Sequence, residues 1–564
     1  MRLLTLIIAM LVGHCLKSFG QCSTWALTTD GDNPANISWN SEFNKESRKL
    51  YVSGEFGEST MEIDSYQLNS LYLPPDPYSS NSYLLQLDES GNVDWVKHMG
   101  KKYDSTLRGR LVSTDDGVIS AFGFNDTAYV EGIEYITDTE HILLSKFDTD
   151  GNLSWIHQLK SDFVQVASIA IDDVGSVYAL GNFYNWVSID DDTLHVLGDP
   201  VELSTEVFMA KFKPTGELVW LKYVGGGIDY HNAEALTYSN GMLFGCGWFI
   251  QEMNLGQDDF VSSSFRNGFL FNMDTTGTIG WSRQFISERV IPLAVKAKAG
   301  NVLVTGLSRT PMSINGLTIN GNGGADGFVV SLNFSGVAES AKSVGGEDTE
   351  LLDHIELVEN NLYLVSGYSN STSFQVDGLE FQNVANEPGW YNQNHFALVL
   401  DTELKADCMY YTESTNSSLG DETNFNHISA DTIWIVSGFV EELPIGDTTL
   451  YSTGGTTFIA KTCMGCDELI RLDAPTIEEE ESQFTVYPNP FTTQTQLNYR
   501  TPQGSKPTLQ LTDMLGRVVQ SVQLPNNEGT YTLQAATLGT GIYFCSLVSG
   551  VEVLATEKLS VIKN

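Results

Sequence analysis

A short run of apolar residues that ends in glycine recurs along most of this 564-residue chain. Repetition of one segment indicates an architecture in which each copy forms a unit that packs against its neighbours. The mean period is about 64 residues, which leaves room for four short strands and their turns. The abundance of Gly, Tyr, Phe and Trp also favours strands joined by tight turns, so we expect an all-β fold. The copies end at Gly54, Gly123, Gly181, Gly247, Gly306, Gly367 and Gly438.

A second signature follows the glycine in the first four copies. An apolar strand runs into a turn, and a tryptophan stands four residues after the glycine of that turn. We expect the indole to fill a wedge between neighbouring sheets. Later copies lose this residue, because Ser340 and Cys408 take its position and the seventh copy has no following tryptophan. The four tryptophans are Trp95, Trp155, Trp220 and Trp281.

The strand missing from the seventh copy has a match at the other end of the chain. Trp25 begins a segment that resembles the strand after each hairpin, so it can complete the sheet opened by residues 458–461. A circular array closed in this way leaves no free edge. The pattern resembles the bacterial seven-bladed β-propeller repeat family and, more distantly, the tryptophan-docked repeats of quinoprotein dehydrogenases. The resemblance implies a seven-repeat propeller over residues 21–466; a linear β-solenoid or two sandwiches are the alternatives.

The N-terminal residues 1–20 have the pattern of a secretory signal peptide. Arg2 precedes an apolar run over residues 3–12, and small or polar residues follow as far as Gly20, where we expect cleavage. The run is too short for a transmembrane segment, and no later segment of the sequence is long and apolar enough.

The last part of the chain reads as a separate unit. Residues 467–483 are acidic, with four successive glutamates at 478–481, and are expected to form an open linker. Residues 484–564 alternate apolar residues with Gly and Pro turns, which predicts a small C-terminal β-sandwich. Tyr-Pro-Asn-Pro opens this segment, and an Asp-x-x-Gly-x-x-Val hairpin, a Gly-x-Tyr strand and a basic residue near the end follow in order.

This order of motifs resembles the C-terminal sorting domain of the type IX secretion system of Bacteroidetes. The resemblance implies that residues 484–564 engage the type IX secretion machinery. The passenger would then pass through the periplasm and be secreted or displayed on the outer cell surface. An ordinary sandwich with a binding role is the alternative.

The charge of the chain excludes some partners. There are 71 acidic and 30 basic side chains, for a net charge of −41. Nucleic acid and anionic membranes would repel such a surface. Calcium is the one possible cofactor, because Asp148 with Asp150, and the run 190–192, offer oxygen ligands. Neither segment continues as an EF-hand, so a solvated acidic turn is the alternative reading.

The repeat alignment suggests a ligand site. Counting 13 residues back from each repeat glycine leads to the innermost strand, at one mouth of the central channel where ligands commonly bind. Arg110, Glu234 and His354 lie at these positions, and a turn two residues shorter puts His427 there in the seventh copy. These four side chains could grip a carboxylated sugar or a metal. The alternative is a water-filled channel with polar walls. The remaining positions of this ring are Ser41, Ser168 and Leu293.

Six cysteines would remain after cleavage, in an oxidising compartment that permits disulfides. Aligning the last hairpin on the earlier copies brings Cys22 opposite Cys463, which predicts a bridge from Cys22 to Cys463 or to Cys466. A local Cys463–Cys466 bridge, or free thiols, are the alternatives. Cys246 lies in a predicted core strand and is expected to be a buried thiol.

No motif of a metalloprotease, a serine hydrolase or a nucleotide-binding loop is present. We therefore expect a secreted or surface-displayed propeller that acts as a non-enzymatic binding or adhesion module for an extracellular glycan or protein. The alternative is an extracellular polysaccharide hydrolase or lyase, which would need two carboxylates about 5–10 Å apart on one propeller face.

Overall fold

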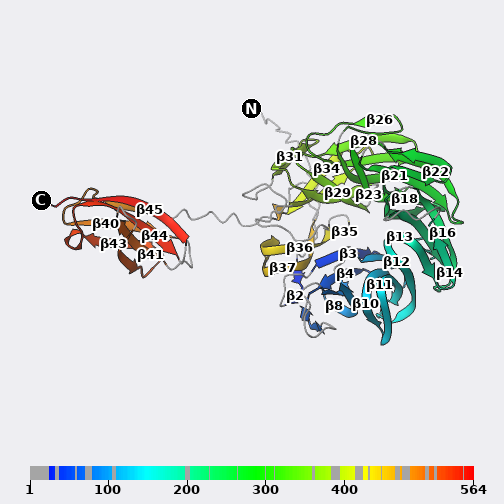
Figure 1. Cartoon of the computed structure of the whole chain (residues 1–564), viewed down its shortest axis with the longest axis horizontal. Helices are drawn as coiled ribbons and strands as arrows, with labels where there is room; N and C mark the ends of the chain where they lie inside the picture. Colours follow the sequence, from blue (N-terminus) through cyan, green and yellow to red (C-terminus); the bar gives the residue numbers. More distant parts are fainter. Residues whose placement is uncertain are drawn as a thin grey trace, which may run out of the picture. The chain divides into compact units, whose positions relative to one another are not determined.

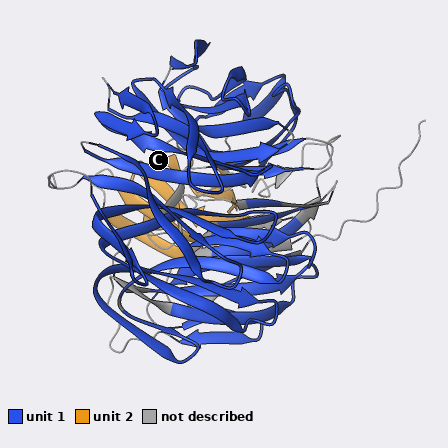
Figure 2. Cartoon of the chain, turned by 90° about the vertical axis from the view of Figure 1, so that its right-hand side faces the viewer, with its two compact units in different colours: residues 1–474 blue, residues 475–564 orange. Residues whose placement is uncertain are grey.

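The computed structural model is all-β, and its described residues contain no helix beyond a short 3-10 turn, η2 (Ala535–Thr537). The chain divides into two compact units, residues 1–474 and 475–564, which we describe separately (Figure 2). The structure describes residues 25–31, 37–57, 60–69, 79–103, 109–196, 204–227, 229–262, 265–298, 300–309, 311–358, 362–382, 394–412, 424–429, 432–445, 448–463, 471–472, 483–501, 507–513, 517–526, 528–549 and 552–563.

In the first unit each sequence repeat forms an antiparallel meander of four strands. The innermost strands are β3 (Ile37–Asn44), β9 (Arg110–Thr114), the second half of β12 (Leu153–Ile171), β17 (His231–Ser239), β23 (Arg289–Lys298), β29 (Glu350–Leu357) and β35 (Asn424–Ser429). The second strands are β4 (Lys49–Phe56), β10 (Gly117–Val130), β13 (Val177–Ile189), β18 (Met242–Phe249), β24 (Asn301–Arg309), β30 (Tyr363–Ser369) and β36 (Thr432–Ile445).

The outer half of each meander is built in the same way. The third strands are β7 (Ser79–Asp88), β11 (Ile133–Asp148), β15 (Thr205–Phe212), β21 (Asn267–Asp274), β27 (Asp326–Asn333), β33 (Asn394–Leu400) and β37 (Thr448–Cys463). The outermost are β8 (Val93–Tyr103), the first half of β12, β16 (Leu218–Gly226), β22 (Ile279–Phe285), β28 (Ala338–Val344), β34 (Ala406–Thr412) and β1 (Trp25–Thr28). Short strands decorate the rim: β2 (Asp30–Gly31), β5 (Thr60–Ile63), β6 (Tyr66–Asn69), β14 (Asp192–His195), β19 (Glu252–Leu255), β20 (Asp258–Val261), β25 (Met312–Ile314), β26 (Leu317–Ile319), β31 (Ser373–Val376) and β32 (Leu379–Gln382).

The meanders close into a ring around a central channel. Each innermost strand contacts the innermost strand of the next meander, and β35 contacts β3. Figure 1 shows β3, β12, β23, β29 and β35 around a common centre, with the outer strands farther away. Buried apolar side chains of adjacent sheets pack together between them, and the first sheet shares a cluster with the last, in which Leu50 and Val52 meet Trp434 and Val436. This arrangement is a β-propeller.

The recurring glycine is required by the path of the innermost strand. Several of these strands carry a β-bulge opposite the glycine, for instance between Pro292 and Ala294. A side chain on Gly306 would collide with the carbonyl oxygen of Ile291, and one on Gly367 would collide with that of Leu351. The same collision is found at Gly181 and Gly247, so the close approach of two backbones explains why this position is glycine in these four copies.

An aspartate holds the turn before Trp95, Trp155 and Trp281, whereas the turn before Trp220 begins with Lys213. In the second repeat the Asp148 carboxylate accepts hydrogen bonds from the backbone N–H groups of Asp150 (3.0 Å) and Asn152 (2.7 Å). Gly151 adopts φ +80°, which side-chain-bearing residues rarely do. The predicted turn chemistry is thus present, and it commits the Asp148 carboxylate to the turn.

The tryptophans join neighbouring sheets as expected. The indole N–H of Trp95 donates to the carbonyl of Thr149 (3.2 Å), which lies in the turn of the next repeat. Trp155 and Trp281 make the same bond to Pro214 (3.2 Å) and Phe334 (2.9 Å). Trp95 is 8% exposed, and the other three tryptophans are partly buried. The rings of Trp95, Trp155 and Trp281 are thus wedges with a polar anchor across the sheet boundary.

The N-terminal strand closes the ring, which confirms the expected pairing. β1 lies antiparallel to β37, with Trp25 opposite Lys461 and Thr28 opposite Phe458. The first and last meanders are also joined by a hydrogen bond of 2.6 Å from the Asn426 amide nitrogen to the Ser41 hydroxyl. The predicted signal peptide, residues 1–20, lies outside the described residues.

We expect deletion of residues 21–28 to leave the edge of β37 open. The loss of four residue pairs should lower the free energy of unfolding by about 2–4 kcal/mol and promote self-association through the bare edge. Light scattering after size exclusion and urea unfolding would measure both effects. A peptide of residues 21–31 added in trans should restore the monomer; a deletion variant that stays monomeric and fully stable would contradict the pairing.

The second unit is a two-layer sandwich with its own core. One sheet has β39 (Gln483–Tyr487), β40 (Gln494–Arg500) and β43 (Glu528–Gln534), and the other has β41 (Thr508–Asp513), β42 (Val518–Gln523), β44 (Gly541–Ser549) and β45 (Glu552–Val561). Leu497, Leu511, Leu533, Leu547 and Leu559 are buried between them. Within the predicted open linker, β38 (Arg471–Leu472) pairs in parallel with Tyr411 and Thr412 of β34.

The described cysteines do not decide the predicted bridge. Cys22, Cys466 and the side chain of Cys463 lie outside the described residues. Cys246, Cys408 and Cys545 are buried thiols, which confirms the expectation for Cys246. The bridge from Cys22 therefore stays a prediction.

Candidate functional site

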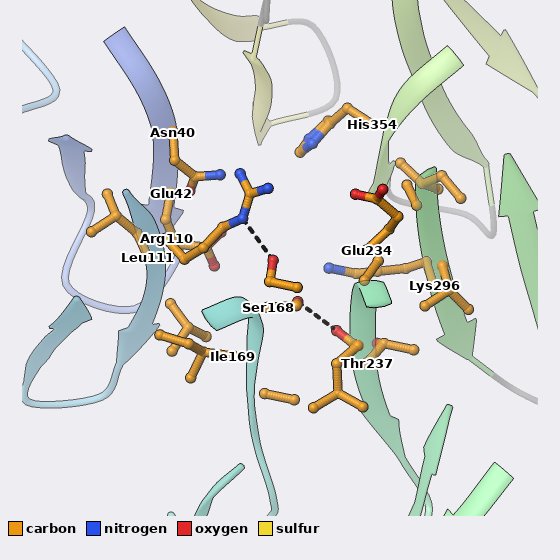
Figure 3. A pocket seen from close by; sticks show the side chains of 18 of the residues that line it. Asn40, Glu42, Arg110, Leu111, Ser168, Ile169, Glu234, Thr237, Lys296 and His354 are labelled. Carbon is orange, nitrogen blue, oxygen red and sulfur yellow. Dashed lines mark hydrogen bonds between the residues drawn. The ribbon is translucent and has the colours of Figure 1, made fainter. Parts of the chain in front are cut away.

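One mouth of the channel opens into a cavity of about 450 Å³. Arg110 on β9, Glu234 on β17 and His354 on β29 line it, and their side chains point into the same space (Figure 3). Ser41, Ser168 and Leu293 of the predicted ring also line the cavity. The backbone of His427 lies in β35, and its side chain is outside the described residues.

Hydrogen bonds position the two charged side chains of this mouth. The Arg110 Nε donates to the carbonyl of Ala167 at 2.6 Å, and the far end of the guanidinium turns into the cavity (Figure 3). The Glu234 carboxylate accepts hydrogen bonds from the Asn232 amide (2.6 Å) and from the indole N–H of Trp248 (2.9 Å). A cation and an anion thus face one cavity, an arrangement suited to a polar ligand.

The residues of the predicted ring do not lie at the same depth along the channel, as judged by their pairing position relative to the repeat glycine. Ser41 pairs with Val52, two residues before a repeat glycine, whereas His354 pairs with Ser366, one residue before. Glu234 is the bulged residue between Ala233 and Ala235. The count of 13 assumed turns of constant length, but Asn44 pairs with Lys49 while Lys298 pairs with Asn301. The differing turns shift the register.

Residues that do share one level were missed by the count. Glu42, Lys296 and Glu356 pair with the residue three before the glycine of their own repeat. Glu42 and Lys296 line both the cavity at this mouth and a second volume of about 530 Å³, which Glu356 also lines. The lengths of the polar turns, 45–48 and 299–300, were the sequence signal that could have placed them.

Glu42 has an unusual protonation behaviour for an extracellular acid. Burial within the channel, with a smaller contribution from Glu356, raises its pKa to about 7 against the opposing attraction of Lys296. The Ser113 hydroxyl donates to its carboxylate at 3.3 Å. A glutamate of this kind exchanges a proton near neutral pH, as general acids do.

The acidic turns considered for calcium hold no group of metal ligands. Among the described residues no set of three or more His, Cys, Asp or Glu side chains is placed to bind a metal ion. Asp148 accepts hydrogen bonds from its own turn, and Asp190 lies 3.1 Å from the His157 ring.

Comparison with known proteins identifies the C-terminal unit. Residues 485–563 match the family described as the secretion system C-terminal sorting domain. This chain is therefore secreted, to the cell surface or the extracellular space. The sorting domain implies that the chain engages the type IX machinery. The described residues include no helix with the length and apolarity needed to cross a membrane.

Solved structures resemble the chain only distantly. The Pan2 WD40 domain of Neurospora crassa is 11% identical, with 76% of this chain and 90% of that one covered and a TM-score of 0.39. PorZ, a surface component of the type IX secretion system of Porphyromonas gingivalis, is also 11% identical, with 93% and 81% covered and a TM-score of 0.18. A protein of unknown function from Bacteroides caccae is 9% identical, with 57% and 88% covered and a TM-score of 0.28. No curated protein matches.

The raised pKa of Glu42 predicts a pH-dependent stability. The folded state holds this proton up to about pH 7, whereas the unfolded chain loses it near the ordinary glutamate pKa of 4.5. Stability should therefore fall as pH rises from 4.5 through 7, by up to about 3 kcal/mol. Glu42→Gln should remove this loss, so that the variant exceeds wild type at pH 8 and matches it more closely at pH 5.

Urea unfolding at the two pH values measures this difference. Glu217→Gln, at an exposed carboxylate paired with Lys213, is the matched control and should show no such trend. An equal effect of Glu42→Gln at pH 5 and pH 8 would show that the carboxylate titrates normally.

Proposed function

We propose that this protein is a seven-bladed propeller exported by the type IX machinery of a Bacteroidetes cell, and that it binds an extracellular glycan or protein at one channel mouth. The observation that carries the proposal is the convergence of Arg110, Glu234 and His354 on one cavity in a secreted chain (Figure 3). The three side chains come from different repeats, so the ring itself sets their spacing.

The rigidity of the ring favours a function in ligand binding, because the site is formed before the ligand arrives. The strands that carry these residues are held on both sides by buried apolar layers, as between Ala233, Leu243 and Phe269. Pre-formed sites lose little entropy when they bind a ligand. The cavity is also large enough for part of an oligosaccharide or a protein loop.

One observation favours a second candidate, an extracellular polysaccharide hydrolase or lyase. Glu42, with its pKa near 7, and Glu234 line the same cavity. Two carboxyl groups, one of which holds its proton near neutral pH, form the kind of pair that glycosidases use.

The test is a glycan and protein array probed with the full-length secreted protein, followed by calorimetry and product analysis of each binder. We expect binding without product release. Arg110→Ala and His354→Ala should each weaken binding about tenfold or more, the loss of one or two charged hydrogen bonds. The melting temperature should stay unchanged.

Ile136→Ala, at an exposed side chain of β11, is the control and should bind like wild type. Released sugar that disappears in Glu42→Gln would establish the enzyme instead. Unaltered binding in both Arg110→Ala and His354→Ala would move the site away from this mouth.

A further inference from the structure

Two arginines meet beside the channel mouth, where the fourth and fifth repeats adjoin. Arg266 immediately precedes β21, and Arg289 is the first residue of β23. Their backbones form an isolated parallel bridge, and the Val290 N–H donates to the Arg266 carbonyl at 3.0 Å. The pairing of two backbone segments thus fixes two like charges next to each other.

Neither guanidinium is neutralised by the described part of the chain. No carboxylate among the described residues forms an ion pair with Arg266 or Arg289, and the Nε of each is buried without a hydrogen-bond partner. Burial and the neighbouring charge of Arg289 lower the pKa of Arg266, although Glu234 acts in the opposite direction. Unpaired, partly buried charges are costly, and acidic side chains outnumber basic ones by 71 to 30.

Aromatic rings complete the surroundings of the pair. The Arg266 guanidinium carbon lies 4.0 Å from the centre of the Trp248 ring, and the indole N–H of Trp248 donates to Glu234 at the channel mouth. Phe265 is 61% exposed, with its ring centre 5.1 Å from the same guanidinium. Trp248 therefore links Arg266 to Glu234 at the channel mouth, and the exposed aromatic side chain of Phe265 lies beside the arginine pair.

We propose that Arg266 and Arg289 form an oxyanion subsite that binds the carboxylate or sulfate of an acidic glycan, with Phe265 against the apolar face of the sugar. Guanidinium groups donate pairs of hydrogen bonds in a geometry that matches both oxyanions. A sugar ring has an apolar face that an exposed aromatic side chain can cover. A peptide of acidic residues has no such face. This assignment rests on the proposed function and names its ligand class.

The first experiment uses the full-length protein and calorimetry with three probes: tetragalacturonic acid, its methyl ester and a sulfated tetrasaccharide. One or both charged probes should bind about tenfold or more tightly than the neutral ester. Which of the two binds distinguishes carboxylate from sulfate recognition. Arg266→Gln and Arg289→Gln should each remove this preference. Lys213→Gln makes the same charge change on an outer turn and should retain it.

The second experiment tests the arginines without any sugar. Sodium sulfate, compared with sodium chloride at equal ionic strength, should raise the melting temperature of wild type by more than that of Arg266→Gln, because the general stabilising effect of sulfate acts on both proteins. Without added sulfate the variant should melt at or above the wild-type temperature, because an unpaired charge is removed. A lower melting temperature would show that Arg266 serves the fold, and would overturn the subsite.

The outcomes separate this subsite from the proposed function. Equal affinity for the acid and its ester, with loss of both in Arg110→Ala, would overturn the subsite and support the mouth. A sulfate effect that requires Arg266 would support the subsite, even if the array of glycans showed that the mouth binds none of them. Tight binding of an acidic peptide in place of all three sugars would overturn the assigned ligand class.

Discussion

Deletion of residues 484–564 is expected to abolish delivery of the protein to the cell surface and to the medium. The segment contains the match to the sorting domain, and it folds around its own buried leucine core. The propeller should remain folded inside the cell, because its sheets and their closing strand all lie before residue 475. Immunoblots of periplasmic, surface and medium fractions from the native host would show the retained protein.

A reciprocal fusion provides the control for this experiment. Residues 475–564 attached to an unrelated, exported fluorescent protein should carry it to the surface, whereas the same reporter alone should stay in the periplasm. Surface delivery of the truncated chain at the wild-type level would refute the sorting role. Limited proteolysis of the retained protein would show that the loss is one of transport and not of folding.

Trp95→Ala is expected to lower the free energy of unfolding of the propeller by about 3–5 kcal/mol, the range for an aromatic removed from a core. The indole contacts Tyr51 and Phe147 from two neighbouring sheets and anchors to Thr149. Trp155→Ala, Trp220→Ala and Trp281→Ala should cost less, toward the lower end of that range, because these rings are partly exposed. Chemical denaturation of purified protein would measure all four.

Val219→Ala, an exposed apolar residue next to Trp220, is the comparison for Trp95→Ala and should change stability by under about 0.5 kcal/mol. Binding by folded Trp95→Ala should resemble wild type. If the variant instead kept its stability and lost a glycan ligand, the indole would be a sugar-stacking platform and not a wedge.

The strands and turns of the propeller could be predicted from the sequence, because each recurring residue has a direct physical cause. The repeat glycine marks a backbone contact, as at Gly306 against Ile291. The turn aspartate marks carboxylate-to-backbone hydrogen bonds, as at Asp148. The likeness between the segment at Trp25 and the outer strands revealed the closing strand, since both must satisfy the same edge.

The candidate site was predictable only in part. The repeat alignment predicted that Arg110, Glu234 and His354 lie near one another, and they line one cavity because any residue near that end of an innermost strand reaches it. Their levels were wrong, since turn length and bulge position vary among repeats. Arg266 and Arg289 could not be paired from sequence, because their contact joins two repeats through an isolated backbone bridge.

The closing strand also imposes an order of events on biogenesis. Among the described strands of the seven meanders, β1 is the first to leave the ribosome and its partner β37 is the last. Until β37 has been made, β1 has no partner, and the last strand made also has an unpaired edge. Any other extended chain could pair with either of them. A four-residue strand offers such a competitor few bonds. The shortness of β1 therefore disfavours its pairing with a competing chain, so that it stays free to pair with β37 once β37 has been made.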